Sequence, residues 1–219
     1  LEKDYEVLVR QDLNDRIEKY KNNSQALMNA LKAAGEDNNA KLVADFFKKQ
    51  GLPAIYVSPA EAGFYLENHK GVVRCLPESY DNLREYLLER HELVVFPGFF
   101  GYDKEGNILT FTRGGSDVTG SILAASVQAD RYENFTDVDC VYAVKPDLVP
   151  SPHPIKEMTY DEMRELAYTG FNILHEDALE PVRRHNIPLH ILNTNNPEGM
   201  GTIIVNKRTD FAGILTGLS

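Results

Sequence analysis

The sequence predicts an α/β fold, with a three-layer α/β/α sandwich around a mostly parallel sheet. Short apolar segments of strand composition alternate with longer segments whose apolar residues recur at helical spacing, and this alternation is typical of parallel sheets covered by helices. The segment 93–96 is apolar without interruption, as expected of a strand covered on both faces. With 219 residues, of which 42% are hydrophobic, the chain can bury a substantial core, so we expect a single compact unit.

The first part of the chain is predicted to be helical. Apolar residues recur at helical spacing over 1–34, and the polar run 22–24 (Asn-Asn-Ser) divides this segment into two helices. A third helix is expected over 39–50, because apolar residues form a stripe there and Gly51 follows at the position that often ends a helix. The segment 53–57 then has the composition of a buried strand.

Strands and helices alternate through the rest of the chain. A hairpin is predicted over 102–112, where Asp, Glu, Gly and Asn supply the turn, and the segment 131–144 is rich in strand-forming residues. The other expected strands cover 71–75, 92–96, 189–192 and 201–205, and the other expected helices cover 79–90, 118–129, 159–169 and 175–185.

Charge and cysteine content argue against several classes of partner and site. The formal net charge of -10 repels phosphate backbones and anionic lipids, so we expect no nucleic acid and no membrane partner. No apolar stretch approaches the roughly 20 residues that a membrane helix needs. Cys75 and Cys140 form no C-x-x-C or Cys/His cluster, which indicates neither a disulfide framework nor a zinc site and favours a reducing, cytoplasmic setting.

The segment 113–117 (Arg-Gly-Gly-Ser-Asp) has the composition of an anion-binding turn. It follows a predicted strand and leads directly into a predicted helix. Glycines allow backbone amides to approach a ligand, and the helix N-terminus adds a partial positive charge. Arg113 would supply a forked donor for a carboxylate or a phosphate. The alternative is a tight turn in which Ser116 or Asp117 caps the helix, a common arrangement without any ligand.

Several motifs occur in a fixed order along the chain. They are 97–101 (Pro-Gly-Phe-Phe-Gly), 113–117, 136–139 (Thr-Asp-Val-Asp), 162–168 (Glu-Met-Arg-Glu-Leu-Ala-Tyr), 174–175 (Leu-His) and 193–197 (Asn-Thr-Asn-Asn-Pro). In this order they resemble the pattern of aspartokinases of the amino acid kinase superfamily, over nearly the whole chain and most densely from 97 to 202. The ordered series is specific, whereas no single motif is.

The resemblance implies an activity and its cofactors. Aspartokinases transfer the γ-phosphoryl group of ATP to the side-chain carboxylate of L-aspartate, giving 4-phospho-L-aspartate on the route to lysine, threonine and methionine. Mg²⁺ bridging the phosphates is implied together with ATP, without a dedicated set of metal ligands from the chain. Because the acceptor carboxylate is already ionised at neutral pH, catalysis requires alignment and charge screening rather than a strong base. Family members are usually dimers or larger, so a homodimer is expected.

The resemblance also implies roles for individual residues. Asp117 matches the catalytic aspartate that orients a lysine beside the transferring phosphoryl group. Glu36 matches the glutamate that holds the α-ammonium group of the substrate, and Arg113 matches the clamp on a substrate carboxylate. The implied substrate-binding residues are Glu36, Arg113, Gly114, Gly115 and Ser116, and the implied ATP-binding residues are Thr136, Asp137, Tyr142, Asp147, Asn172 and Ile173.

Without the resemblance, the same residues have simpler interpretations. Glu36 would be a solvated acidic residue before a helix, favoured there by the helix dipole. Asp117 would be a helix cap, a role that can coexist with a catalytic one. Thr136, Asp137 and Tyr142 would belong to an edge strand and a turn.

The chain also departs from the aspartokinase pattern. Cys140 stands where the family commonly has Gly, and 145–147 (Lys-Pro-Asp) and 170–172 (Gly-Phe-Asn) stand where it has Asp-Pro-Arg and Gly-Ala-Lys. The family's opening Lys-Phe-Gly-Gly strand does not occur before Leu1. We therefore expect 1–206 to be a catalytic domain that lacks this strand and is inactive by itself, and 207–219 to lead towards a C-terminal regulatory (ACT) domain.

Two other functions fit parts of the pattern. One is a module that binds or senses an amino acid or a nucleotide on the same fold, which the departures on the nucleotide side favour. The other is a kinase for another acid, such as glutamate or N-acetylglutamate. Glu36 favours a substrate with a free ammonium group and therefore argues against the acetylated acid.

Overall fold

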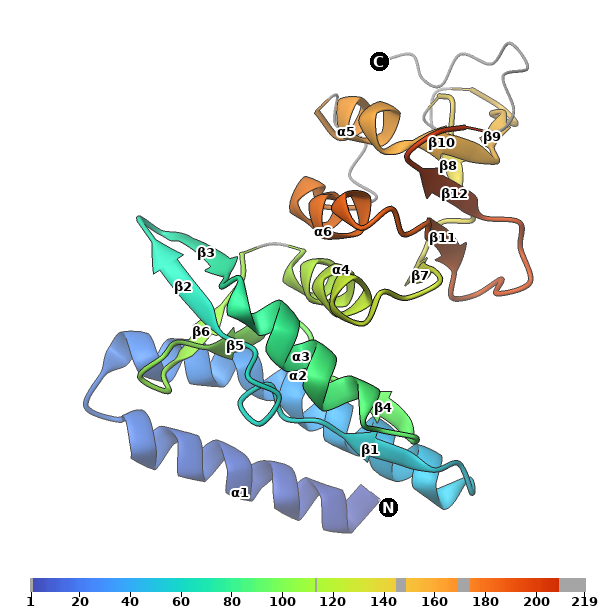
Figure 1. Ribbon diagram of the computed structural model, residues 1–219. Coiled ribbons are helices and arrows are strands. Elements are labelled where there is room, and N and C mark those ends of the chain that lie inside the picture. Colours follow the sequence, from blue (N-terminus) through green and yellow to red (C-terminus); the bar gives the residue numbers. More distant parts are fainter. Residues whose placement is uncertain (1, 113, 145–148, 169–173, 209–219) are drawn as a thin grey trace. The chain divides into compact units, whose positions relative to one another are not determined.

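The computed structural model describes residues 2–112, 114–144, 149–168 and 174–208 (Figure 1). Although the composition predicts one compact unit, the chain divides into two, Leu1–Thr119 and Gly120–Ser219. The boundary expected at residue 206 differs from the division between these two units, and the assignment of 1–206 and 207–219 to separate domains stays a prediction. Among the described residues, every helix is too short or too polar to cross a membrane.

Two long helices open the first unit. They are α1 (Glu2–Tyr20) and α2 (Ser24–Lys49), and Asn23 between them accepts a hydrogen bond from the Ala26 N–H at 3.0 Å. This N-cap confirms the predicted break at 22–24. The expected break between 34 and 39 is wrong, because the helix continues through Gly35. Alanines with high helix propensity surround that glycine, and their buried side chains hold this part of α2 in the core.

A buried polar network joins α1, α2 and the strand that follows them. Asp37 of α2 is the centre of this network, with the Arg16 Nη2 at 2.5 Å and the Lys41 Nζ at 2.8 Å from its Oδ2. The Tyr56 hydroxyl also donates to Asp37. Burial alone would raise the pKa of Asp12, but hydrogen bonds from Arg16 of α1 and Asn38 of α2 outweigh it and hold this pKa below its ordinary value.

The strands of the first unit form a parallel pair and two hairpins. The parallel pair is β1 (Ala54–Tyr56) with β4 (Leu93–Val95), and the hairpins are β2 (Leu66–His69) with β3 (Val72–Cys75) and β5 (Phe100–Tyr102) with β6 (Ile108–Thr110). Helix α3 (Glu78–Leu88) lies between β3 and β4 in the chain. These elements confirm the predicted strands and the predicted hairpin, while β2 was not predicted.

Helix α2 packs against β1, β4 and β6 and closes one part of the core. Ala30 and Ala33 of α2 are fully buried and lie against Phe100 and Ile108. Alanine allows the helix to approach the β5–β6 hairpin closely, and the Asn29 side chain adds a hydrogen bond to the Ile108 carbonyl at 2.9 Å. These contacts therefore fix the position of α2 on the strands.

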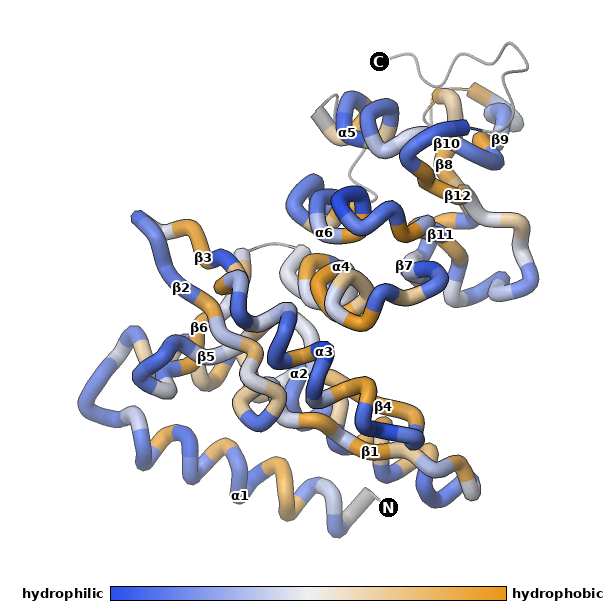
Figure 2. Tube along the Cα trace, in the orientation of Figure 1, coloured by the Kyte–Doolittle hydropathy of each residue, from blue (hydrophilic) through white to orange (hydrophobic). Residues whose placement is uncertain are grey.

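The chain passes from the first unit to the second within α4 (Gly115–Val127). Figure 2 shows the contrast between this helix, which is mostly hydrophobic or neutral, and α1, which is mostly hydrophilic. Small residues and apolar residues are buried along it, as predicted for 118–129. The helix begins three residues earlier than predicted, inside the glycine turn.

The second unit is built on a four-stranded sheet in the order β10-β12-β11-β7. The β10–β12 and β7–β11 pairs are parallel, and the β11–β12 pair is antiparallel. The bounds are β7 Tyr132–Thr136, β8 Val141–Tyr142, β9 Pro154–Ile155, β10 Glu157–Thr159, β11 Leu189–Asn193, β12 Thr202–Val205, α5 Tyr160–Tyr168, the short 3-10 helix Glu176–Ala178 and α6 Leu179–Arg184. Among the described residues, all three pairings between strands that are not consecutive in the chain are parallel, and the four pairings between consecutive strands are antiparallel. Parallel pairing of strands separated by helices confirms the α/β class.

One buried hydroxyl ties the small β8–β9 pair to this sheet. The Thr202 Oγ1 accepts the Val141 N–H at 2.8 Å and donates to the Ile155 carbonyl at 2.6 Å. Thr202 is fully buried, so both bonds replace interactions that water would otherwise provide. The start of β8 is thereby fixed.

Candidate active site

The glycine turn before α4 is shaped by close packing. Gly114 has φ +74°, a left-handed conformation that L side chains rarely adopt. A Cβ on Gly115 would lie 2.5 Å from the Phe111 Cβ, which leaves no space for a side chain. Both positions therefore require glycine, and the turn holds its backbone close against the preceding strand.

The loop 97–101 packs directly on the start of α4. A Cβ on Gly98 would lie 2.9 Å from the Ser116 Cα. The Phe99 N–H donates to the Thr119 Oγ1 at 3.1 Å, and that hydroxyl donates to the Gly115 carbonyl at 2.9 Å. Phe99 itself has φ +76°, which is strained for a bulky residue and is held by these surroundings. Strained backbone of this kind is concentrated at functional sites.

This packing leaves the polar side of the turn accessible. Ser116 is exposed, and Asp117 and Gly114 are partly exposed at the N-terminus of α4. The positive end of the helix dipole and the first-turn amides favour an anion there. Four predicted residues, Gly114 to Asp117, are therefore together at one end of a helix. Arg113 lies outside the described residues.

Glu36 is placed on α2, with its side chain exposed to solvent. Its role as a substrate ligand stays a prediction, but its setting differs from the expected one, because Glu36 lies inside a helix and not before one. Sequence reasoning missed its neighbour Asp37, which is buried. The signal was available, since Asp37 falls on the helical stripe that Ala33, Ala40 and Ala44 form.

The predicted nucleotide residues that the structure describes lie in the second unit. Thr136 ends β7, and its hydroxyl is 3.2 Å from the Oδ1 of the exposed Asp137. Tyr142 is partly exposed in β8, and the adjacent Cys140 thiol, with partial burial, raises its pKa. Asp147, Asn172 and Ile173 lie outside the described residues.

A turn after β11 braces the loop that carries Thr136 and Asp137. The Asp139 Oδ1 accepts hydrogen bonds from the Asn193 Nδ2 at 2.9 Å and the Asn196 Nδ2 at 3.3 Å. Strands β7 and β11 are parallel neighbours, so their carboxyl ends meet at one edge of the sheet, the usual place for ligand sites in α/β proteins. The Asn-Thr-Asn-Asn run indicates a polar turn here, but it does not indicate that Asp139 is the partner of that turn.

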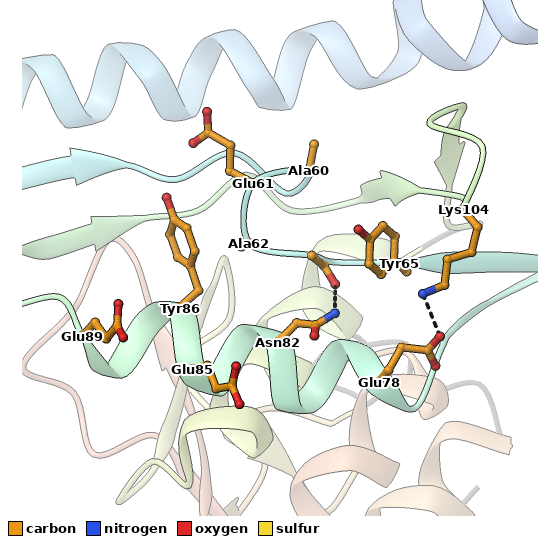
Figure 3. Close-up of a pocket in the computed structure, with 11 residues that line it drawn as sticks. Ala60, Glu61, Ala62, Tyr65, Glu78, Asn82, Glu85, Tyr86, Glu89 and Lys104 are labelled. Carbon is orange, nitrogen blue, oxygen red and sulfur yellow. Dashed lines mark hydrogen bonds and ion pairs between the residues drawn. The ribbon is translucent and has the colours of Figure 1, made fainter.

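The first unit also has a hollow between α3 and the loop that precedes β2 (Figure 3). It is lined by Ala60, Glu61, Ala62, Gly63, Tyr65, Glu78, Asn82, Glu85, Tyr86, Glu89 and Lys104. Its Lys104 Nζ is 2.8 Å from the Glu78 Oε1 and lies 4.0 Å from the centre of the Tyr65 ring. None of the predicted site residues that the structure describes lines this hollow, and Lys104, the only cation among its described lining residues, is paired with Glu78.

Residues 4–193 match the amino acid kinase family, and the chain belongs to that family. Within it, the chain is similar to aspartokinases: it is 51% identical over 211 residues to aspartokinase 3 of Bacillus subtilis, covering 96% of this chain and 46% of that protein. It is 34% identical over 177 residues to the aspartate kinase of Pseudomonas fluorescens, covering 81% and 42%.

A solved structure gives the same result for the fold. The chain matches Escherichia coli aspartokinase III in complex with aspartate and ADP with a TM-score of 0.81 and 27% identity, over 92% of this chain and 46% of that one. This match supports the predicted α/β/α arrangement. The chain spans about half the length of the relatives that it matches.

Proposed function

We propose that this chain takes part in the ATP-dependent phosphorylation of the side-chain carboxylate of L-aspartate to 4-phospho-L-aspartate. The observation that carries the proposal is the close-packed turn from Gly114 to Asp117 at the start of α4, in a chain 51% identical to an aspartokinase. The turn offers backbone donors and the positive end of a helix to an anion. A chain with net charge -10 needs such a local field to attract an anionic substrate.

The first unit would bind the amino acid. Ser116, with the amides of Gly114 and Gly115, is proposed to hold a substrate carboxylate together with Arg113. Glu36 would pair with the α-ammonium group, which explains why an exposed carboxylate is useful on α2. Asp117 at the start of α4 would act beside the phosphoryl group as the catalytic aspartate.

The second unit would bind the nucleotide. A hydroxyl, a carboxylate and an aromatic face suit ribose, base and phosphate groups. They are provided by Thr136 at the end of β7, Asp137 directly after it and Tyr142 in β8. Asp147, Asn172 and Ile173 complete the proposed set. The E. coli aspartokinase III structure contains aspartate and ADP, which supports this pair of ligands.

Magnesium is proposed to enter with ATP. The described residues include no group of three His, Cys, Asp or Glu side chains that could hold a metal. Mg²⁺ bound to a nucleotide needs no such group, because phosphate oxygens and water fill most of its coordination sphere. The residues present therefore fit a metal carried by the nucleotide, which would screen phosphate charge.

The proposed reaction needs little acid–base chemistry from the protein. A carboxylate oxygen of aspartate forms a bond to the γ-phosphorus as the bond from that phosphorus to the β–γ bridging oxygen breaks, and ADP leaves. Both groups are anionic, so the donors around Ser116 would align them and offset their repulsion. The product would serve lysine, threonine and methionine synthesis in the cytoplasm, and the whole protein is proposed to be a homodimer or larger.

The test uses the whole protein in an assay with hydroxylamine, which converts an acyl phosphate to a coloured hydroxamate complex with iron(III). We expect ATP-dependent hydroxamate from aspartate and little from glutamate or N-acetylglutamate. Binding of these acids without turnover would instead favour a sensor module. Equal turnover of glutamate would favour a kinase for another acid, and both results would overturn the proposal.

A pair of variants tests the aspartate side. Glu36→Gln keeps the shape of the side chain but removes its charge, so the KM for aspartate should rise about tenfold, in line with a lost charge-assisted hydrogen bond, while the KM for ATP stays within twofold. Glu85→Gln is the matched control, because Glu85 is also an exposed glutamate on a helix of the first unit. Equal effects of the two substitutions would contradict the role of Glu36.

A further inference from the structure

The loop between β7 and β8 is held at three points that lie on other elements. At its start, the Thr194 N–H donates to the Thr136 carbonyl at 2.8 Å, which continues the β7–β11 pairing by one step. In its middle, Asp139 accepts the two asparagine amides described above. At its end, the Val141 N–H is bound by the buried Thr202 hydroxyl at 2.8 Å.

The asparagine turn that provides these donors is closed on itself. The Asn195 N–H donates to the Asn193 Oδ1 at 2.8 Å, and the Asn196 N–H donates to the Asn193 carbonyl at 3.1 Å. A turn with its own side-chain and backbone bonds presents its amides in a fixed direction. Asp139 therefore meets a turn whose backbone and Asn193 side chain are already held, and Asn196 adds its amide from the same turn.

The hydrogen bonds at Thr136 and Asp139 constrain the part of the loop that lies between them. Thr136 and Asp137 lie between the backbone anchor and the Asp139 anchor, and their side chains contact each other at 3.2 Å. Asp137 and Asp139 are both exposed, so the loop has no burial of its own at these side chains to hold it. The direction of the Asp137 carboxylate and the Thr136 hydroxyl thus depends on the bonds made by Asp139.

We propose that Asn193 and Asn196 are positioning residues for the nucleotide. Through Asp139 they hold the loop in the shape that Thr136 and Asp137 need in order to bind ATP. This inference rests on the proposed function of the same loop. It adds a specific dependence of ATP binding, and not of aspartate binding, on amides at the end of β11.

The test measures ADP affinity by titration and the KM values for ATP and aspartate, using the whole protein. Asp139→Ala should weaken ADP binding and raise the KM for ATP about five- to tenfold, with the KM for aspartate within twofold. Asp139→Asn keeps one acceptor oxygen and should recover part of the loss. Asn195→Ala is the matched control, since the Asn195 side chain makes no hydrogen bond with the part of the chain that the structure describes, and it should change nothing.

A double variant separates positioning from direct contact with the nucleotide. Asn196→Ala alone should weaken ADP binding two- to threefold, because it removes the longer of the two bonds. If Asn196 acts only through Asp139, then adding Asn196→Ala to Asp139→Ala should have no further effect. Additive losses would overturn the positioning role, and so would an ADP affinity equal to wild type in Asp139→Ala.

The outcomes also distinguish this inference from the proposed function. A wild-type protein that binds ADP but makes no aspartyl hydroxamate would refute the proposed function while the ADP titrations still test the brace. A wild-type protein that phosphorylates aspartate would refute the inference alone if the two Asp139 variants, Asn196→Ala and the double variant all keep the wild-type ADP affinity. If circular dichroism shows that Asp139→Ala is unfolded, the milder Asn196→Ala and Asp139→Asn variants decide the question.

Discussion

Replacing Arg16 with methionine should destabilise the first unit strongly. The guanidinium is 2.7 Å from the Asp12 Oδ2, 2.5 Å from the Asp37 Oδ2 and 3.2 Å from the Ala30 carbonyl. The side chains of Arg16 and Asp37 are only 12% and 7% exposed. Methionine would preserve most of the apolar packing but leave two carboxylates without their shared cation.

The size of the effect follows from burial. Breaking a buried ion pair by removing one partner costs about 3–5 kcal/mol. Asp37 would keep Lys41 and the Tyr56 hydroxyl, so we expect the lower end, about 3 kcal/mol. With a urea dependence of about 2 kcal/mol per M, the unfolding midpoint should fall by about 1.5 M.

The assay is urea unfolding followed by far-ultraviolet circular dichroism, to which α1 and α2 contribute strongly. Arg10→Met is the matched control on the same helix: Arg10 also pairs with an acid four residues away, Glu6, but these side chains are 74% and 61% exposed. An exposed pair is worth about 0.3–0.5 kcal/mol, so this midpoint should move by about 0.2 M. Equal, small shifts for both variants would refute the reasoning that burial makes the Arg16 network strong.

Two further predictions concern single positions. Gly201→Ala should destabilise the protein by at least about 2 kcal/mol, because φ is +62° and the new Cβ would lie 2.2 Å from the Ile191 carbonyl oxygen. Gly106→Ala is the control: this residue is also left-handed but has open space around it, so the substitution should cost about 1 kcal/mol in the same urea unfolding. A larger loss of stability for Gly106→Ala than for Gly201→Ala would contradict the packing. Burial raises the pKa of the Cys75 thiol to about 12, so a thiol reagent at pH 8 should modify Cys75 on the order of 10³-fold more slowly in the native protein than in the urea-unfolded one. Burial also raises the pKa of the Cys140 thiol, so its labelling should be slower in the native protein too, and rapid labelling of either native thiol would contradict this.

Periodicity and turn chemistry predicted most elements of the fold. The N-cap at Asn23 and the apolar strand of 93–95 were predictable because both are local signals. The continuity of α2 through Gly35 was not predictable from local propensity, because buried alanines packed on distant strands decide it. Strand β2 was missed since its sequence, Leu-Glu-Asn-His, has weak strand composition and depends on its pairing with β3.

The candidate site was predictable to the extent that it is made of consecutive residues. The turn from Gly114 to Asp117 combines glycines with a helix start, and that combination is visible in a single sequence. The burial of Asp37 could be predicted from its place on the helical stripe, but its partners and those of Asp139 could not, because they come from separate parts of the chain. Sequence separation hides such contacts even where every partner is an ordinary polar residue.

The position of Asp37 has a consequence for its neighbour Glu36. Successive residues of an α-helix are about 100° apart around its axis, so fixing one side chain determines the direction of the next. Contacts from α1 and β1 clamp Asp37 on the inner side, and α2 cannot roll about its long axis without breaking them. The contacts of Asp37 thus set the outward direction of Glu36, and a helix that holds one carboxylate inside can present the adjacent carboxylate to solvent at a constant angle.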